Sequence, residues 1–190
     1  ADDLCVIRSM HGSNSRHGGA LLELHTGSDT FIRPSMGSWI NYGLGTENEN
    51  LPGFITICPS LTHGGVNNWS SAFLPAVNHG TPLGNASVPS DKAQVKFIQN
   101  SQLPRDLQRL QLDRLNARNR DYLNQTGPDA ALEARINSFE LAFRMQQEMP
   151  QVEDLSRETE ATRKLYGLDN PVTENFGRMC LLARRFAEAG

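Results

Sequence analysis

The stretch Phe54-Ile55-Thr56-Ile57-Cys58 is an apolar run of strand length, and it is enclosed by Pro52-Gly53 and Pro59. A short run of this kind between chain-breaking residues is typical of a fully buried strand in a parallel sheet. Leu4-Cys5-Val6-Ile7 has the same character, and Val95-Lys96-Phe97-Ile98 is a candidate for a third strand. These runs predict an α/β fold with a parallel sheet.

The segment between the first two predicted strands contains two candidate helices. Gly18–His25 has apolar residues at helical spacing, and Thr26-Gly27 can end that helix. Ser35–Tyr42 is the second, with Ser35 as a plausible N-cap and Gly43 as a C-terminal stop. A strand followed by helices and another strand indicates an α/β crossover.

The second half of the chain has the pattern of long amphipathic helices. One runs from about residue 104 to Gly127, one from Leu132 to Pro150, and one opens at Thr173 or at Asn170-Pro171. We therefore expect one α/β domain over residues 1–190, with a strand-rich and loop-rich part at 1–90 and a mostly helical part at 91–190. The chain begins almost on a strand and ends after a helix, so we also expect an incomplete domain, a fragment of a longer protein.

Composition excludes several classes of protein. Apolar residues make up 38% of the chain and charged residues 21%, which is enough to build a core. The net charge of −3 disfavours nucleic acid as a partner, and the arginines of the predicted helices alternate with acidic residues. The apolar runs are too short to span a membrane, and we find no signal peptide in this chain. Three widely spaced cysteines make neither a disulfide framework nor a zinc motif.

The densest polar cluster is the segment 11–19, which reads His-Gly-Ser-Asn-Ser-Arg-His-Gly-Gly and follows the first predicted strand. The carboxyl end of a parallel strand is where ligands bind in open α/β sheets. The free N–H groups of the next helix favour an anion such as phosphate or sulfate. The residues of this loop suggest three roles: Ser13, Ser15 or His11 in catalysis, Arg16 and Asn14 in anion binding, and His17 as a metal ligand.

A structural interpretation of the same loop stays open, and on the sequence alone it is favoured. Ser or Asn side chains can cap the next helix while the histidines lie at the surface. Neither a P-loop nor a Gly-x-Ser-x-Gly motif is present. His25 and Thr26 are further cleft candidates, although a cation and a glycine at that position are typical of a helix C-terminus. His63 follows the second predicted strand and could approach the same cleft.

Several motifs resemble one bacterial family. The longest, at residues 33–45, reads Arg-Pro-Ser-Met-Gly-Ser-Trp-Ile-Asn-Tyr-Gly-Leu-Gly, and it is highly specific. Others lie at residues 8–11, 25–28, 47–54, 69–75, 140–146 and 180–185. Together they look like the domain-of-unknown-function 1501 family, which is often labelled sulfatase-like and grouped with the alkaline-phosphatase superfamily. The resemblance covers essentially the whole chain.

The resemblance implies a partial alkaline-phosphatase/sulfatase-like sheet flanked by helices, with a helix-rich C-terminal half. Superfamily members hydrolyse phosphate or sulfate esters with metal ions, and family members are typically exported and longer than this chain. Their metal ligands lie mainly outside the matched segment. We therefore expect a divalent metal in the full-length parent, none bound tightly by this chain alone, and little activity from the fragment itself.

The sequence also departs from the sulfatase pattern. Ser13-Asn14-Ser15-Arg16 precedes Leu24-His25-Thr26-Gly27 in the order of the sulfatase motif, but the spacing is longer and its proline is missing. The family usually has Asn-His where this chain has Arg16-His17, so only the histidine matches.

Two hypotheses follow. The chain belongs to a hydrolase of small anionic esters, or it belongs to a non-catalytic exported binding or scaffold protein. Apolar surface left uncovered would favour self-association of the fragment.

Overall fold

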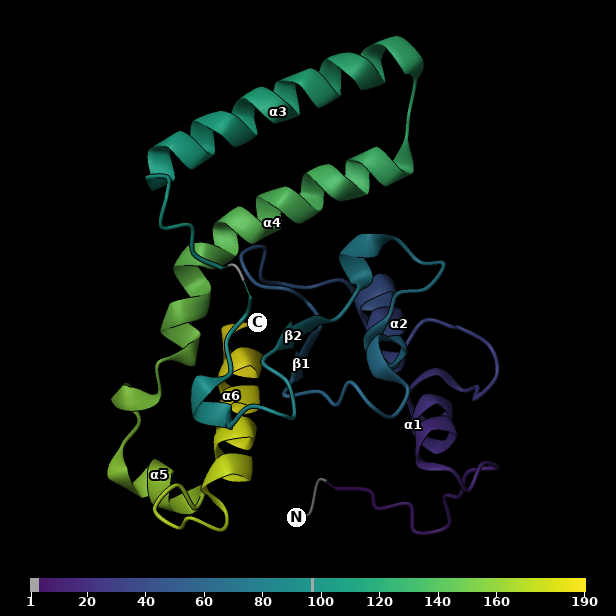
Figure 1. Ribbon diagram of the computed structural model, residues 1–190, viewed down its shortest axis with the longest axis vertical. Helices are drawn as coiled ribbons and strands as arrows, with labels where there is room; N and C mark the ends of the chain where they lie inside the picture. The colour runs from purple at the N-terminus through teal and green to yellow at the C-terminus, as the bar shows by residue number, and fades with distance from the viewer. Residues whose placement is uncertain (1–3, 97) are drawn as a thin grey trace.

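The computed structural model describes residues 4–96 and 98–190 and has mixed α and β structure (Figure 1). The larger helices are α1 (His17–Thr26), α2 (Met36–Leu44), α3 (Arg105–Thr126), α4 (Ala130–Glu153), α5 (Glu160–Leu165) and α6 (Glu174–Ala189). The strands are β1 (Ile55–Ile57) and β2 (Thr81–Leu83). Short 3₁₀ helices are η1 (Gly65–Trp69), η2 (Ala76–Asn78), η3 (Ser90–Lys92) and η4 (Leu155–Arg157).

The sheet is small and parallel. β1 pairs with β2 in the register Ile55 to Thr81 and Ile57 to Leu83. The predicted strand at 54–58 is therefore confirmed, although β1 is half-buried rather than fully buried. Its partner was not expected, because Pro82 stands in the middle of β2 and proline cannot donate a ladder hydrogen bond. Pro82 is tolerated because a two-stranded sheet leaves one edge of each strand unpaired.

The predicted strand Leu4–Ile7 is wrong. This segment has no regular structure, and its side chains are exposed, at 75% for Leu4 and 64% for Ile7. Within residues 4–96 and 98–190, no strand lies beside it to accept its backbone hydrogen bonds. The third predicted strand fails as well, since Val95 and Ile98 lie outside any strand. Phe97 of that stretch is outside the described residues.

Local signals place α1 and α2 correctly. α1 ends at Gly27, whose φ of 72° suits glycine. Ser35 caps α2 as predicted, because its side chain accepts from the Ser38 N–H. α2 ends at Leu44 with Gly45 as its C-cap, two residues beyond the predicted stop at Gly43. The buried Ser38 hydroxyl donates to the Ser70 carbonyl at 3.0 Å, which attaches α2 to the end of η1.

The core lies where the C-terminal half of α4, α6 and β2 meet. Leu83, Met149 and Leu181 have no exposed surface and lie in one apolar cluster. The expectation that Pro150 ends the second long helix is wrong, because α4 continues to Glu153. Met149 and Val152 are buried on either side of Pro150, so tertiary packing keeps the last turn helical.

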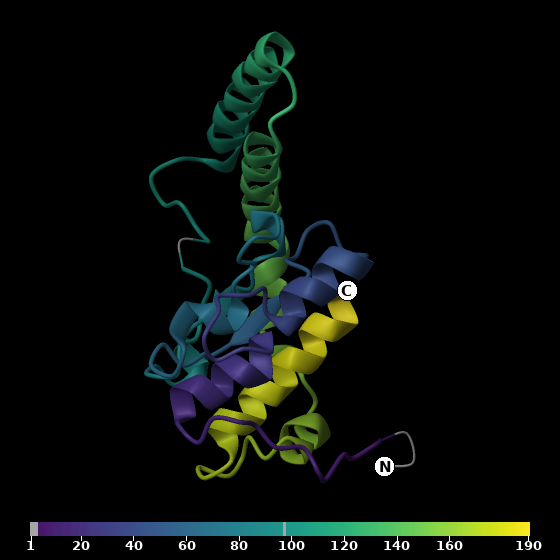
Figure 2. The same cartoon turned by 90° about the vertical axis from the view of Figure 1, so that its right-hand side faces the viewer.

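Helix α3 pairs with α4 in a hairpin that projects from the molecule in both views (Figures 1 and 2), while α4 also contacts η2. Its contacts are mainly polar. The Arg109 guanidinium donates twice to the Glu140 carboxylate at 2.8 Å, and buried Asn116 donates to the same group. The apolar stripe predicted for this helix remains about half exposed, at 47% for Leu110 and 42% for Leu115.

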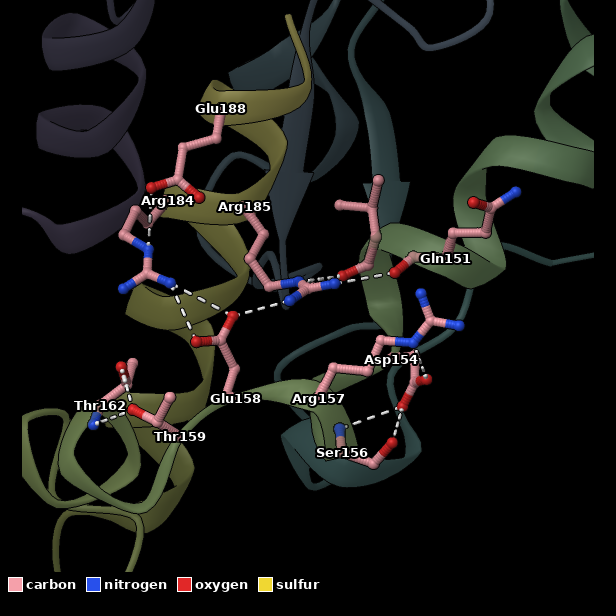
Figure 3. A network of polar contacts seen from close by, with 11 residues as sticks. Gln151, Asp154, Ser156, Arg157, Glu158, Thr159, Thr162, Arg184, Arg185 and Glu188 are labelled. Atoms are coloured by element: carbon pink, nitrogen blue, oxygen red, sulfur yellow. Dashed lines mark hydrogen bonds and ion pairs between the residues drawn. The ribbon is translucent and has the colours of Figure 1, made fainter.

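A polar network joins the end of α4 to α6 (Figure 3). Arg185 donates to the carbonyls of Val152 at 2.7 Å and Gln151 at 2.8 Å, and to Glu158 at 2.6 Å. Arg184 donates to the other side of the Glu158 carboxylate at 3.1 Å. Hydrogen bonding from Arg185 holds the pKa of Glu158 below its usual value.

Within residues 4–96 and 98–190, no helix is long and apolar enough to cross a membrane.

Candidate functional site

The loop before α1 is organised around the Glu23 carboxylate, which comes from the middle of that helix. The Ser13 N–H donates to both carboxylate oxygens, at 2.9 and 3.1 Å, and the Asn14 N–H donates at 3.3 Å. The Ser13 hydroxyl donates to Glu23 at 2.9 Å. These two loop N–H groups, which lie before the start of α1, therefore already bind an anion from the protein itself.

Asn14 also acts within the loop. Its Oδ1 accepts from the Arg16 N–H at 2.8 Å, and its Nδ2 donates to Asp29 at 2.7 Å. Arg16 is the N-cap residue of α1 and makes no side-chain capping bond. The side chain of Asn14 thus orders the entrance to the helix, which agrees with the structural interpretation of this loop.

The pKa values of the two carboxylates follow from these bonds. The backbone N–H and then the hydroxyl of Ser13 hold the pKa of Glu23 below its usual value. The Asn14 amide does the same to the pKa of Asp29. A carboxylate stabilised in its ionised form is a weak base, so Glu23 gives the Ser13 hydroxyl little activation as a nucleophile.

His17 and His63 come together at the N-terminus of α1. Their ring centroids are 5.4 Å apart, with the rings tilted by 50°. His17 is the first residue of α1, and His63 lies in the loop after β1. The structure therefore brings together two of the predicted cleft residues, one from each of two segments that are distant in sequence.

The main chain around His63 explains how the pair is formed. Gly64 and Gly65 have φ values of 85° and 56°, which turn the chain sharply into η1. A side chain at Gly18 would lie 4.0 Å from the His63 Cα, so α1 approaches this loop closely. The Asn68 Nδ2 donates to the His63 carbonyl at 2.7 Å and so connects η1 to this loop.

The other predicted site residues lie in the same loop before α1 or serve the fold. His11, Ser15 and Arg16 are exposed. The Thr26 hydroxyl donates to the Leu22 carbonyl at 2.7 Å, which is a helix-ending role. His25 lies in the last turn of α1 and lines a mainly apolar cavity between α1, α2 and β1.

The His17–His63 pair could provide two imidazole ligands to a metal ion, and water could occupy the remaining positions. In the part of the chain that the structure describes, no group of three His, Cys, Asp or Glu side chains is placed to hold a metal. Neither Glu23 nor Asn68 belongs to a motif that marks it as a site residue. Glu23 lies ten residues from Ser13, and no local pattern links the two.

Comparison with known proteins gives one match. No curated protein and no solved structure matches the chain. A family described as "Protein of unknown function (DUF1501)" matches residues 1–190, the whole length of the sequence. The resemblance seen in the motifs is thereby confirmed at the level of this family. The chain belongs to the DUF1501 family.

Proposed function

We propose that this chain forms part of a metal-dependent hydrolase of phosphate or sulfate esters, on an alkaline-phosphatase/sulfatase-like fold, in an exported protein. The observation that carries the proposal is the pairing of His17 with His63 at the start of α1, beyond the end of β1. His63 follows the carboxyl end of the parallel strand β1, which is where ligand sites lie in α/β proteins. The resemblance to the family supports the substrate class and the export.

The residues near the pair have distinct roles in this proposal. A divalent ion bound there would polarise an oxygen of the ester. Arg16 is exposed at the N-cap of α1 and could bind the anionic group through two parallel N–H donors. Ser15 is also exposed and could face the ester, whereas Ser13 would first have to leave Glu23. His11 is exposed in the same loop and could transfer a proton.

The second candidate is a non-catalytic exported binding or scaffold protein. Glu23 favours it, because that carboxylate already occupies the N–H groups of Ser13 and Asn14. Apolar side chains on α2 support a scaffold that associates with itself, since Trp39 is 46% exposed and Ile40 is 53% exposed. Light scattering over a range of protein concentrations tests that association, and a mass equal to one chain throughout contradicts it.

The decisive experiment uses the full-length protein that the gene encodes. Metal content is measured, and phosphate and sulfate esters are screened with and without a chelator. We expect chelator-sensitive turnover, and we expect His17→Ala and His63→Ala each to lose both bound metal and turnover. His11→Ala is the matched variant, because its exposed imidazole lies outside the pair: it should keep the metal while changing the pH dependence of turnover.

Each outcome decides between the candidates. Bound metal without turnover supports the binding protein. Absence of both metal and turnover in the correctly folded protein contradicts the hydrolase. Turnover that survives in His17→Ala and His63→Ala would show that the catalytic site does not include this pair.

A further inference from the structure

β1 has one edge that carries backbone hydrogen-bonding groups but pairs with no strand in the described part of the chain. On its other edge, toward β2, the Phe54 carbonyl accepts a hydrogen bond at 2.9 Å and the Cys58 N–H donates one at 2.8 Å. Backbone groups alternate between the two edges along a strand, so the N–H and C=O groups of Ile55 and Ile57 face the open edge. An open edge of this kind is a template for another extended chain.

Helices cover both faces of β1 and leave a cavity on each. One cavity, of about 430 Å³, lies between β1 and α6, and its lining includes Ile55, Ala183 and Phe186. The other, of about 440 Å³, lies between β1 and the helices α1 and α2, and its lining includes Thr56 and Ile40. The strand residues in both linings belong to β1. A strand added to β1 would therefore lie between two helix layers, with alternate side chains entering each cavity.

The chain itself contains a segment with the character of such a strand. Leu4-Cys5-Val6-Ile7 is apolar throughout and contains two β-branched residues, which favour extended structure. All four residues are exposed, with Val6 at 74%. Figure 1 shows the purple chain before α1 running below that helix, apart from β1 and β2. Apolar side chains gathered in water in this way mark a surface that another surface covers.

The loop that follows this segment holds it away from the open edge of its own sheet. The Ser13 N–H donates to the Glu23 carboxylate at 2.9 Å, and the Asn14 Nδ2 donates to Asp29 at 2.7 Å. Both carboxylates belong to α1 or to the turn after it, so these bonds attach the loop to α1. The open edge of β1 is therefore left for a segment from another molecule.

From these features we infer that residues 4–7 of a second copy of the chain add to the open edge of β1 as a third strand. Their backbone would bond to the free groups of β1, and side chains would bury alternately: Leu4 and Val6 in one cavity, Cys5 and Ile7 in the other. Each copy carries one segment and one edge, so exchange in both directions closes a dimer. This inference does not depend on ester hydrolysis.

The test measures association and burial of the segment in the same samples. The full-length protein is examined by sedimentation over a range of concentrations, and iodoacetamide modifies its thiols. Cys5 is exposed in the single chain. It should react about tenfold more slowly once about nine-tenths of the copies are dimers, because only the free segment reacts. Cys180, which is half-buried on α6 and outside both cavity linings, is the internal reference.

Two variants remove one partner each without disturbing the single chain, because both residues are exposed in it. Val6→Asp places a charge on the segment, and Ala183→Glu places one in the cavity beside α6. Each should raise the dissociation constant of the dimer at least about tenfold, since pairing would bury the charge. Val172→Asp and Ala117→Glu are the matched controls, because both positions are exposed and lie outside the two cavities, and they should leave association unchanged.

A mixture of the two variants tests the pairing directly. Val6→Asp keeps a competent edge and Ala183→Glu keeps a competent segment, so the mixture should associate more strongly than either variant alone.

Four results would overturn the inference. The first is the mass of one chain at every concentration, and the second is an equal rate of Cys5 modification in monomer and dimer. The third is a mixture that associates no better than its separate components. The fourth is association that persists in Val6→Asp but is lost in Trp39→Ala, which would place the interface on α2 and leave the scaffold candidate standing without this strand.

Discussion

Replacing Arg185 by methionine would test the polar network between α4 and α6. The substitution keeps a long unbranched side chain but removes the bonds to Val152, Gln151 and Glu158 (Figure 3). Two carbonyls at the end of α4 lose their partner, and Glu158 keeps only Arg184. The side chain of Glu158 is only 10% exposed and that of Arg185 only 17%, so water replaces these bonds poorly.

The magnitude follows from the type of bond. A hydrogen bond to a charged group contributes about 1.5 to 3 kcal/mol, and losing one partner of a largely buried ion pair costs about 3 to 5 kcal/mol. Because the two carbonyls can recover some hydration, we expect the free energy of unfolding to fall by about 3 kcal/mol. For a chain of this length, that lowers the melting temperature by about 6 to 12 °C.

Urea unfolding followed by circular dichroism measures this loss. Arg157→Met is the matched control in the same network, since the Arg157 side chain is 77% exposed and lies 3.7 Å from Asp154. That variant should change stability by no more than about 0.5 kcal/mol. If Arg185→Met costs less than about 1 kcal/mol, or no more than Arg157→Met, the reasoning from burial is refuted.

Three further changes test other parts of the molecule. Burial raises the pKa of Glu153 to about 6 from its usual 4.5, so the free energy of unfolding should fall as pH rises through that interval. Measured by urea titration, Glu153→Gln should therefore stabilise the protein by at most about 2 kcal/mol at pH 7 and leave its stability unchanged at pH 4. Leu181→Ala should cost about 2 to 5 kcal/mol in calorimetry, because Leu181 has no exposed surface, and a loss below 1 kcal/mol would show that the core there collapses around the change. Ser35→Ala should cost about 1 to 2 kcal/mol by loss of the α2 cap, whereas Ser35→Thr should restore most of the stability in the same thermal scan.

The elements that the sequence predicts well are those with local signals. Ser35 as the cap of α2 and Gly27 as the stop of α1 each depend on residues within a few positions of one another. The predicted strand at Leu4–Ile7 shows the limit of that reasoning, because an apolar run becomes a strand only where another strand lies beside it. Pro82 concealed β2 because proline disfavours a strand, but it is tolerated at the unpaired edge of a two-stranded sheet.

In the candidate site, too, some features could be predicted from the sequence and others could not. His63 was expected near His17 because both were placed after predicted strands, and the structure brings the two rings together although the strand expected before His17 does not form. The role of Glu23 could not be predicted, since its bonds to Ser13 depend on how the loop folds back over α1. His25 was grouped with the other histidines, but the helix turns its side chain toward the cavity beside β1.

The polar hairpin of α3 and α4 has a consequence for the order in which the chain folds and opens. Arg109 and Glu140 are 31 residues apart, and the hairpin closes through bonds within its own segment. The ring of Phe143 adds a stacked contact with the Arg109 guanidinium, 4.9 Å from the ring centre. Contacts this local can form before the sheet and the core assemble. Because α3 packs on α4 outside the core, its amide hydrogens can exchange with solvent through local opening, while those around Leu83 and Leu181 exchange only when the whole molecule unfolds.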